Sequence, residues 1–185
     1  MVMEQVKNVT HSKILRNLFF ALVGSIVLAI SAKMKIPFYP VPMTMQTLVV
    51  LLIGICFGWK LGVATVFLYL FEGVIGLPVF SGTPEKGLGL IYFTGPTMGY
   101  LIGFLVAVFF SGKFNYNENF ILNFFKLTVS TSFIYIFGII WLGELIGWDK
   151  PIFELGVKPF LLAELLKILI ASVIVNKFKK LRKII

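Results

Sequence analysis

The chain has 185 residues, of which 58% are apolar and only 14% are charged, and its mean hydropathy is +0.96. Soluble domains carry about 25% charged residues, so this composition excludes a water-soluble globule and an intrinsically disordered chain. The net charge of +9 would favour nucleic acid in a soluble protein, but the basic residues gather at the ends of apolar runs, which indicates a membrane protein and no nucleic-acid partner. The single cysteine, Cys56, excludes a disulfide framework and is expected to fill apolar space in a helix.

The apolar runs predict an all-α membrane bundle of six transmembrane helices in a single domain covering residues 1–185. The first run, 14–32, is followed by a loop with three prolines that cannot be helical. The next two runs are joined through residues 58–62 as an antiparallel hairpin, and an irregular stretch rich in glycine and proline, 76–89, follows them. The five later spans are expected at residues 44–57, 61–75, 95–112, 120–142 and 160–175.

Six crossings place both ends of the chain on one side of the cell membrane. That side holds eleven basic residues, namely Lys7, Lys13, Arg16, Lys60, Lys113, Lys126, Lys177, Lys179, Lys180, Arg182 and Lys183. The opposite side holds five, namely Lys33, Lys35, Lys86, Lys150 and Lys158. The positive-inside rule therefore predicts cytoplasmic termini, with an N-terminal segment over 1–13 and a basic tail over 176–185. The longer loops then cap a pocket that opens outward.

Small residues recur every four positions in two of the predicted spans. The fourth span carries Gly95, Gly99, Gly103, Ala107 and Ser111, and the first carries Ala21, Ser25 and Ala29. Such stripes let another backbone approach closely. Internal packing is the simpler interpretation for the fourth span, whereas the stripe of the first span is equally compatible with packing and with docking of a partner subunit.

Two charges interrupt the last apolar run. Glu164 and Lys167 stand three residues apart on one helix face, so they can pair and offset part of the cost of charge in a membrane. Charged residues within spans usually face a bundle interior or a cavity, which favours a polar ligand over a purely structural ion pair. Glu72, near the end of the third span, is expected to snorkel or to face the following loop.

The sequence contains none of the common catalytic or nucleotide-binding patterns. The segment 111–114 lacks the glycine and the hydroxyl residue of a phosphate-binding loop, and His11 has no partner for a metal site. We therefore expect no catalytic residues, no metal and no cofactor, and the protein is not expected to be an enzyme. A transporter of this kind must use an ion gradient, act passively, or depend on ATP hydrolysis by other subunits.

Several segments taken together resemble the BioY family, the biotin-binding S components of energy-coupling-factor (ECF) transporters. They lie at residues 40–52, 77–81, 87–89, 95–104 and 164–167, and the resemblance covers essentially the whole chain from the first span onward. The resemblance implies a six-helix bundle that binds biotin in an outward-facing cavity and works with a membrane coupling (T) subunit and two ATPase subunits. It also implies that Glu164 and Lys167 hold the bicyclic head of the vitamin, and that Ala21, Ser25 and Ala29 dock the coupling subunit.

The chemistry of biotin fits these residues. Its ureido ring has two N–H donors and a carbonyl acceptor, so Glu164 can accept from an N–H group and Lys167 can donate to the carbonyl. The family usually has aspartate at the first position, and the longer glutamate requires a shifted contact. Tyr39 and Tyr92 are expected to cover the ligand, Lys86 to meet its carboxylate, and Gln46 and Ser81 to complete the site.

Three alternatives stay open at this point. The chain is a stand-alone permease for a vitamin or small metabolite, an S component for a different vitamin, or a membrane scaffold in which the Glu164–Lys167 pair is purely structural.

Overall fold

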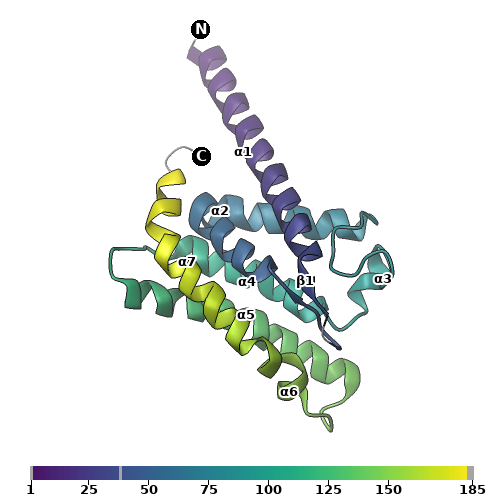
Figure 1. Cartoon of the computed structure of the whole chain (residues 1–185). Helices are drawn as coiled ribbons and strands as arrows, with labels where there is room; N and C mark the ends of the chain where they lie inside the picture. Colours follow the sequence, from purple (N-terminus) through teal and green to yellow (C-terminus); the bar gives the residue numbers. More distant parts are fainter. Residues whose placement is uncertain (1, 38, 183–185) are drawn as a thin grey trace.

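The computed structural model describes the backbone of residues 2–37 and 39–182, and the side chains of residues 13–37 and 39–182. The predicted segments 1–13 and 176–185 therefore lie partly outside the described residues. The elements in chain order are α1 (Val2–Lys33), β1 (Lys35–Ile36), β2 (Met43–Thr44), α2 (Gln46–Val74), α3 (Leu90–Phe93), α4 (Met98–Lys113), α5 (Phe120–Ile146), α6 (Ile152–Gly156), the 3₁₀ helix η1 (Lys158–Phe160) and α7 (Leu161–Leu181) (Figure 1).

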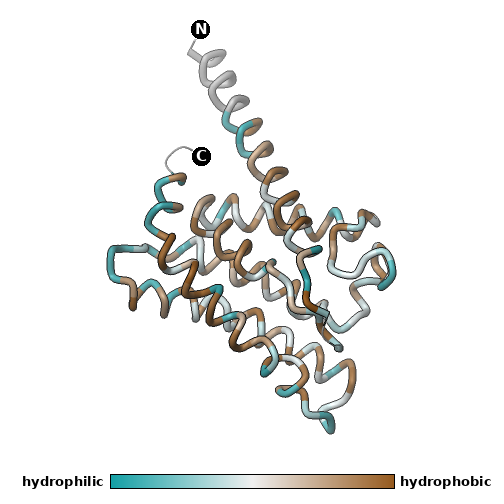
Figure 2. Tube along the Cα trace, in the orientation of Figure 1, coloured by the Kyte–Doolittle hydropathy of each residue, from teal (hydrophilic) through white to brown (hydrophobic). Residues whose placement is uncertain are grey.

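The predicted apolar runs are helical, and the multi-pass membrane architecture is confirmed. Four segments are long and apolar enough to cross a membrane, at Lys13–Lys33, Gln46–Val74, Phe120–Ile146 and Ile152–Leu181, and α4 is a shorter apolar helix. Apolar colouring dominates these helices, while hydrophilic residues gather at links and at the end of α7 (Figure 2). The fourth run becomes helical at Met98 rather than at the predicted residue 95, because the turn that holds Gly95 and Pro96 precedes it.

Helix α2 is divided at Gly58, where the predicted hairpin turns. Gly58 has φ 74° and ψ 172°, a conformation that is essentially confined to glycine. A Cβ atom built on Gly62 would lie 3.5 Å from the Cα atom of Gly54, whereas residues eight apart in a straight helix are separated by about 12 Å. The arms 46–57 and 59–74 therefore run back along each other. Six crossings remain a prediction, because each arm and α4 are shorter than the roughly 20 residues of a usual span.

The small-residue stripe of α4 packs inside the protein. A Cβ on Gly99 would lie 2.3 Å from the carbonyl oxygen of Phe137, and one on Gly103 would lie 2.6 Å from the Cα of Ile134. These contacts bring α4 against the backbone of α5. Farther along the stripe, Ala107 and Ser111 are fully buried. The stripe is used for internal packing, as the simpler interpretation expected.

The stripe of α1 also faces the protein interior. Ala21 and Ser25 are buried and Ala29 is half-buried, while the flanking apolar residues of α1 are exposed. Ser25 donates a hydrogen bond to the Glu72 carboxylate on the second arm of α2. This contact explains how Glu72 is accommodated in an apolar helix. It also means that Ala21 and Ser25 are covered by the chain's own hairpin, so docking a partner through them would require α1 to move.

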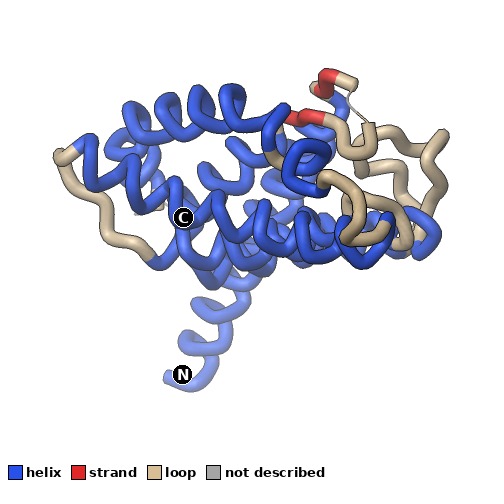
Figure 3. Tube along the Cα trace, turned by 90° about the horizontal axis from the view of Figure 1, so that it is seen from below, coloured by secondary structure: helices blue, strands red, loops and turns tan. Residues whose placement is uncertain are grey.

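The connections at the end of the bundle away from the termini form a linked cap. The loop after α1 is closed by the antiparallel pair of β1 and β2, in which Lys35 pairs with Thr44 and Ile36 with Met43. The ammonium of Lys33 donates to the carbonyl oxygens of Phe80 and Thr83, at 3.0 and 3.2 Å, which ties this strand pair to the loop after α2. The strands lie beside the loop segments in Figure 3. The candidate site lies below this cap.

Candidate functional site

A cavity with about 540 Å³ of space, its opening included, lies between the cap and the helices. Its walls come from the β2–α2 junction, the loop after α2, the start of α4, the middle of α5 and the start of α7. Most lining side chains are apolar or aromatic, with a few polar groups among them, namely Thr44, Gln46, Thr47, Ser81, Thr97 and Glu164.

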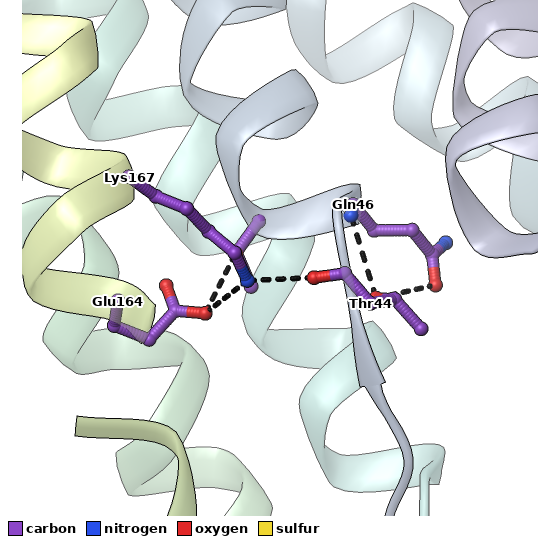
Figure 4. A network of polar contacts seen from close by, with 5 residues as sticks. Thr44, Gln46, Glu164 and Lys167 are labelled. Carbon is purple, nitrogen blue, oxygen red and sulfur yellow. Dashed lines mark hydrogen bonds and ion pairs between the residues drawn. The ribbon is translucent and has the colours of Figure 1, made fainter. Parts of the chain in front are cut away.

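The Glu164–Lys167 pair lies in the first two turns of α7 and is bound to the β2–α2 junction (Figure 4). The Lys167 ammonium lies 2.6 Å from Glu164 Oε1, 2.6 Å from the carbonyl oxygen of Thr44 and 3.0 Å from Thr47 Oγ1. The Thr47 hydroxyl also donates to Glu164 Oε1, at 2.8 Å. Both charged residues are only 5% exposed. This network occupies all three donors of Lys167 and fixes one of the two oxygens of Glu164.

Two buried oxygen atoms on the cavity wall have no hydrogen-bond partner among the described residues. They are Glu164 Oε2 and Ser81 Oγ. A buried polar atom without a partner costs about 1–3 kcal/mol, so such atoms are uncommon unless a ligand or water completes them. A carboxylate oxygen accepts hydrogen bonds, whereas a serine hydroxyl accepts and donates. The cavity is therefore prepared for a ligand that has an N–H or O–H donor and a second polar group.

Gln46 lines the cavity beside Thr44, and Tyr69 of the second α2 arm holds its side chain in place. Its side-chain amide donates to the Tyr69 hydroxyl at 2.8 Å, and that hydroxyl donates to the carbonyl of Val79 at 3.2 Å. The Thr44 hydroxyl lies 3.3 Å from Gln46 Oε1 (Figure 4). Gln46 is thus positioned by the core of α2 and by the loop after it. Sequence reasoning placed Gln46 in the site, and the structure brings it there together with Glu164, Ser81 and Tyr92.

Tyr92 forms the wall next to Ser81. Its hydroxyl donates to the carbonyl oxygen of Ser81 at 2.8 Å, and its ring stacks on Phe80 with centroids 4.7 Å apart. Burial raises the pKa of the Tyr92 hydroxyl above its ordinary value of 10.0, so the group is neutral at physiological pH and remains a donor. These contacts fix the orientation of the loop segment that presents Ser81 Oγ.

Three of the candidate residues do not line the cavity. Lys167 is buried in the network with Glu164, and the other two, Tyr39 and Lys86, belong to the cap. Tyr39 is 91% exposed in the loop between the two strands. Lys86 is also exposed and is not part of the lining. Partial burial and the neighbouring charge of Lys35 lower the pKa of Lys86. Neither side chain meets Glu164 in this conformation, so a contact of either one with a ligand requires the cap to rearrange.

Sequence reasoning missed several wall residues. Thr44 and Thr47 surround Lys167, and Tyr100 and Tyr135 project from α4 and α5 into the lining. The Tyr100 hydroxyl donates to the carbonyl of Gly156 at 2.9 Å, which joins α4 to the end of α6. A signal for the threonines was present, because Thr44, Gln46 and Thr47 are polar residues at the start of the apolar run predicted over 44–57. The tyrosines gave none, since aromatic residues are common throughout these spans.

Residues 3–184 match the BioY family. A probable biotin transporter BioY of Pyrococcus horikoshii is 33% identical over 82% of this chain and 88% of its own length. The biotin transporter BioY of Thermotoga maritima is 32% identical over 90% and 98%, respectively.

The fold has a solved counterpart. The crystal structure of an S component for biotin from an ECF-type ABC transporter superposes with a TM-score of 0.76, at 24% identity, over 91% of this chain and 93% of that one. That likeness supports the helical arrangement, and the sequence matches over nearly the whole length decide the family. The chain belongs to the BioY family, whose members are transport proteins and not enzymes.

Proposed function

We propose that the protein is the biotin-binding S component of an ECF-type ABC transporter, which captures the vitamin outside the cell and delivers it inward. The single observation that carries this proposal is the pair of unpartnered oxygens, Glu164 Oε2 and Ser81 Oγ, on the wall of a mostly apolar cavity. The names of the relatives supply the identity of the ligand.

The chemistry of the cavity suits the ureido ring of biotin. Glu164 Oε2 would accept from a ring N–H group, and the apolar and aromatic walls would cover the thioether ring and the aliphatic tail. The Ser81 hydroxyl would bond to another polar group of the ligand. Lys167 has no spare donor in this conformation, so a bond to the ureido carbonyl requires exchange of an existing acceptor such as the Thr44 carbonyl.

The proposed topology has six crossings and cytoplasmic termini. The two arms of α2 would each cross much of the membrane as halves of the hairpin, and α4 would form the fourth crossing. The excess of basic residues at the end that holds the termini supports a cytoplasmic location for that end. A membrane coupling (T) subunit and two ATPase subunits would supply the energy of transport, since no nucleotide-binding pattern was found in this sequence.

Calorimetric titration of the purified, detergent-solubilised protein with biotin tests the proposal. We expect one-to-one binding. The variant Glu164→Gln replaces the free acceptor with an amide, and loss of a hydrogen bond to a charged group costs about 1.5–3 kcal/mol, or roughly a 10- to 150-fold weaker affinity. The matched control is Glu154→Gln, which changes an exposed acid paired with Lys158 at the same end and should bind like the wild type.

Other outcomes would decide among the alternatives. A folded protein that binds no biotin, but binds another vitamin, would keep the transport role and change the substrate. Binding with unchanged affinity in Glu164→Gln would remove that residue from the site. Biotin uptake into vesicles that contain this chain alone would favour a stand-alone permease.

A further inference from the structure

A second cavity lies at the opposite end of the bundle, beside the Gly58 turn. It is open to solvent, with about 750 Å³ of space when its opening is included, and is lined by Asn17, Phe57, Lys60, Leu61, Ala64 and Arg182. These residues come from α1, both arms of α2 and the cap of α7. The cavity is therefore built by segments far apart in the chain, at the end where both termini lie (Figure 1).

Arg182 is fixed in this cavity by backbone contacts. Its Nη2 donates to the carbonyl oxygens of Gly54, at 3.0 Å, and of Gly112, at 2.6 Å. Those carbonyls lie near the C-terminal ends of the first α2 arm and of α4, where a positive charge is favourable. The Nε atom has no partner among the described residues. The guanidinium is thus held in place with donor capacity left over.

The charges of the cavity are unbalanced. Lys60 and Arg182 both line it, no acidic side chain does, and neither cation takes part in an ion pair among the described side chains. The Lys60 ammonium lies 5.5 Å from the centre of the Trp59 ring, and Trp59 is partly exposed. Tryptophan and lysine together are typical of the membrane–water interface.

The rest of the cavity is apolar. Phe57, Leu61 and Ala64 line it, and the exposed apolar residues Leu18 and Phe19 follow the lining residue Asn17 in α1. A ligand that matches both parts carries a phosphate and an acyl chain. Basic pockets between transmembrane helices bind the head groups of anionic lipids in this manner. A soluble anion would leave the apolar part without a partner.

We propose that this cavity binds the phosphate head group of one anionic phospholipid, with Lys60 and Arg182 as its cationic ligands. The bound lipid would neutralise the two charges and brace α1 against the hairpin turn and α7. This site is separate from the biotin cavity and does not depend on the proposed transport function.

Native mass spectrometry of the full-length protein in detergent tests this proposal. Dioleoylphosphatidylglycerol and dioleoylphosphatidylcholine, which share their acyl chains, are titrated separately, and bound lipids are counted. We expect one phosphatidylglycerol to bind more tightly than phosphatidylcholine, and Lys60→Gln to weaken its binding about fivefold, since one basic residue contributes about 1 kcal/mol. Lys60 is exposed, so this variant leaves the packing intact.

Lys113→Gln is the matched control. Lys113 lies at the same end of the bundle and 5.3 Å from the centre of an aromatic ring, that of Phe109, but does not line the cavity. Equal loss in both variants, or equal binding of both lipids, would overturn the proposal. Inorganic phosphate that competes as well as the lipid would show a soluble anion instead. Unchanged lipid binding in Lys60→Gln, combined with weaker assembly with partner subunits, would assign the cavity to an acidic partner segment and refute the lipid site.

Discussion

Lys167→Met isolates the part that the buried ion pair plays in shaping the proposed biotin cavity. Lys167 is 5% exposed and makes three hydrogen bonds, to Glu164, Thr47 and the carbonyl of Thr44. Methionine fills a similar volume without the charge. The substitution leaves the Glu164 carboxylate buried without its counter-ion and frees the Thr44 carbonyl, so both stability and ligand binding should suffer.

The size of the effect follows from the burial of the pair. Removing one partner of a buried ion pair costs about 3–5 kcal/mol. For a chain of this length each kcal/mol lowers the melting temperature by about 2–4 °C, so the expected fall is about 6–20 °C. Biotin affinity should fall as well, because Glu164 then loses the contact that holds its carboxylate in place.

A double variant separates stability from binding. Glu164→Gln/Lys167→Met removes both charges, and replacing a whole buried pair is often neutral for stability. Its melting temperature should therefore recover toward the wild-type value, while biotin binding stays weak because the free carboxylate oxygen is gone. Thermal unfolding in detergent and calorimetric titration measure the two effects. A Lys167→Met protein that melts within 2 °C of the wild type and binds biotin normally would refute the reasoning.

Three further outcomes are expected. Ser25→Leu should overpack the contact with Glu72 and lower the free energy of unfolding by about 1–3 kcal/mol in the isolated protein. An unchanged melting temperature combined with loss of partner co-purification would instead indicate that the small-residue stripe of α1 docks a partner subunit. Gly58→Ala should cost about 1–3 kcal/mol, because alanine rarely adopts the glycine conformation of the turn, and a melting curve equal to that of the wild type would contradict it. Burial raises the pKa of the Tyr92 hydroxyl, so on raising the pH the unfolded chain loses the hydroxyl proton before the folded protein does. The free energy of unfolding should therefore fall as pH rises above 10. Tyr92→Phe should make this pH dependence smaller in unfolding measured from pH 8 to 11.

Helix positions were predictable from the sequence because the membrane imposes a simple rule. A span needs a long apolar run, and the predicted segment 120–142 is observed as Phe120–Ile146. The turn at Gly58 was predicted from the glycines that flank Trp59 and Lys60. The site was predictable where a charge interrupts an apolar run, as Glu164 and Lys167 do, since only a special environment offsets its cost.

The remaining features depend on contacts between distant parts of the chain. The predicted last span, 160–175, continues as a helix to Leu181, and the cation that follows it turns back onto the bundle. Arg182 reaches carbonyl groups 128 and 70 residues earlier. Nothing in the local pattern distinguishes it from the other basic residues of the tail. For the same reason the exposure of Tyr39 and the burial of Ser25 became visible only in the folded structure.

Helix α7 and its C-cap residue Arg182 link the two cavities, because both are attached to the first arm of α2 or its junction with β2. Lys167 binds the β2–α2 junction, and Arg182, 15 residues later, binds Gly54 near the end of the same α2 arm. At 1.5 Å per residue the two attachments are about 22 Å apart, so α7 is fastened to the first arm at both of its ends. A ligand that takes the place of the Thr44 carbonyl on Lys167 would remove one contact of the upper attachment, while the contacts with Thr47 and the lower attachment would remain. On the proposed function the two cations would therefore differ, since Lys167 has an acceptor that a ligand could replace, whereas Arg182 is held by backbone carbonyls.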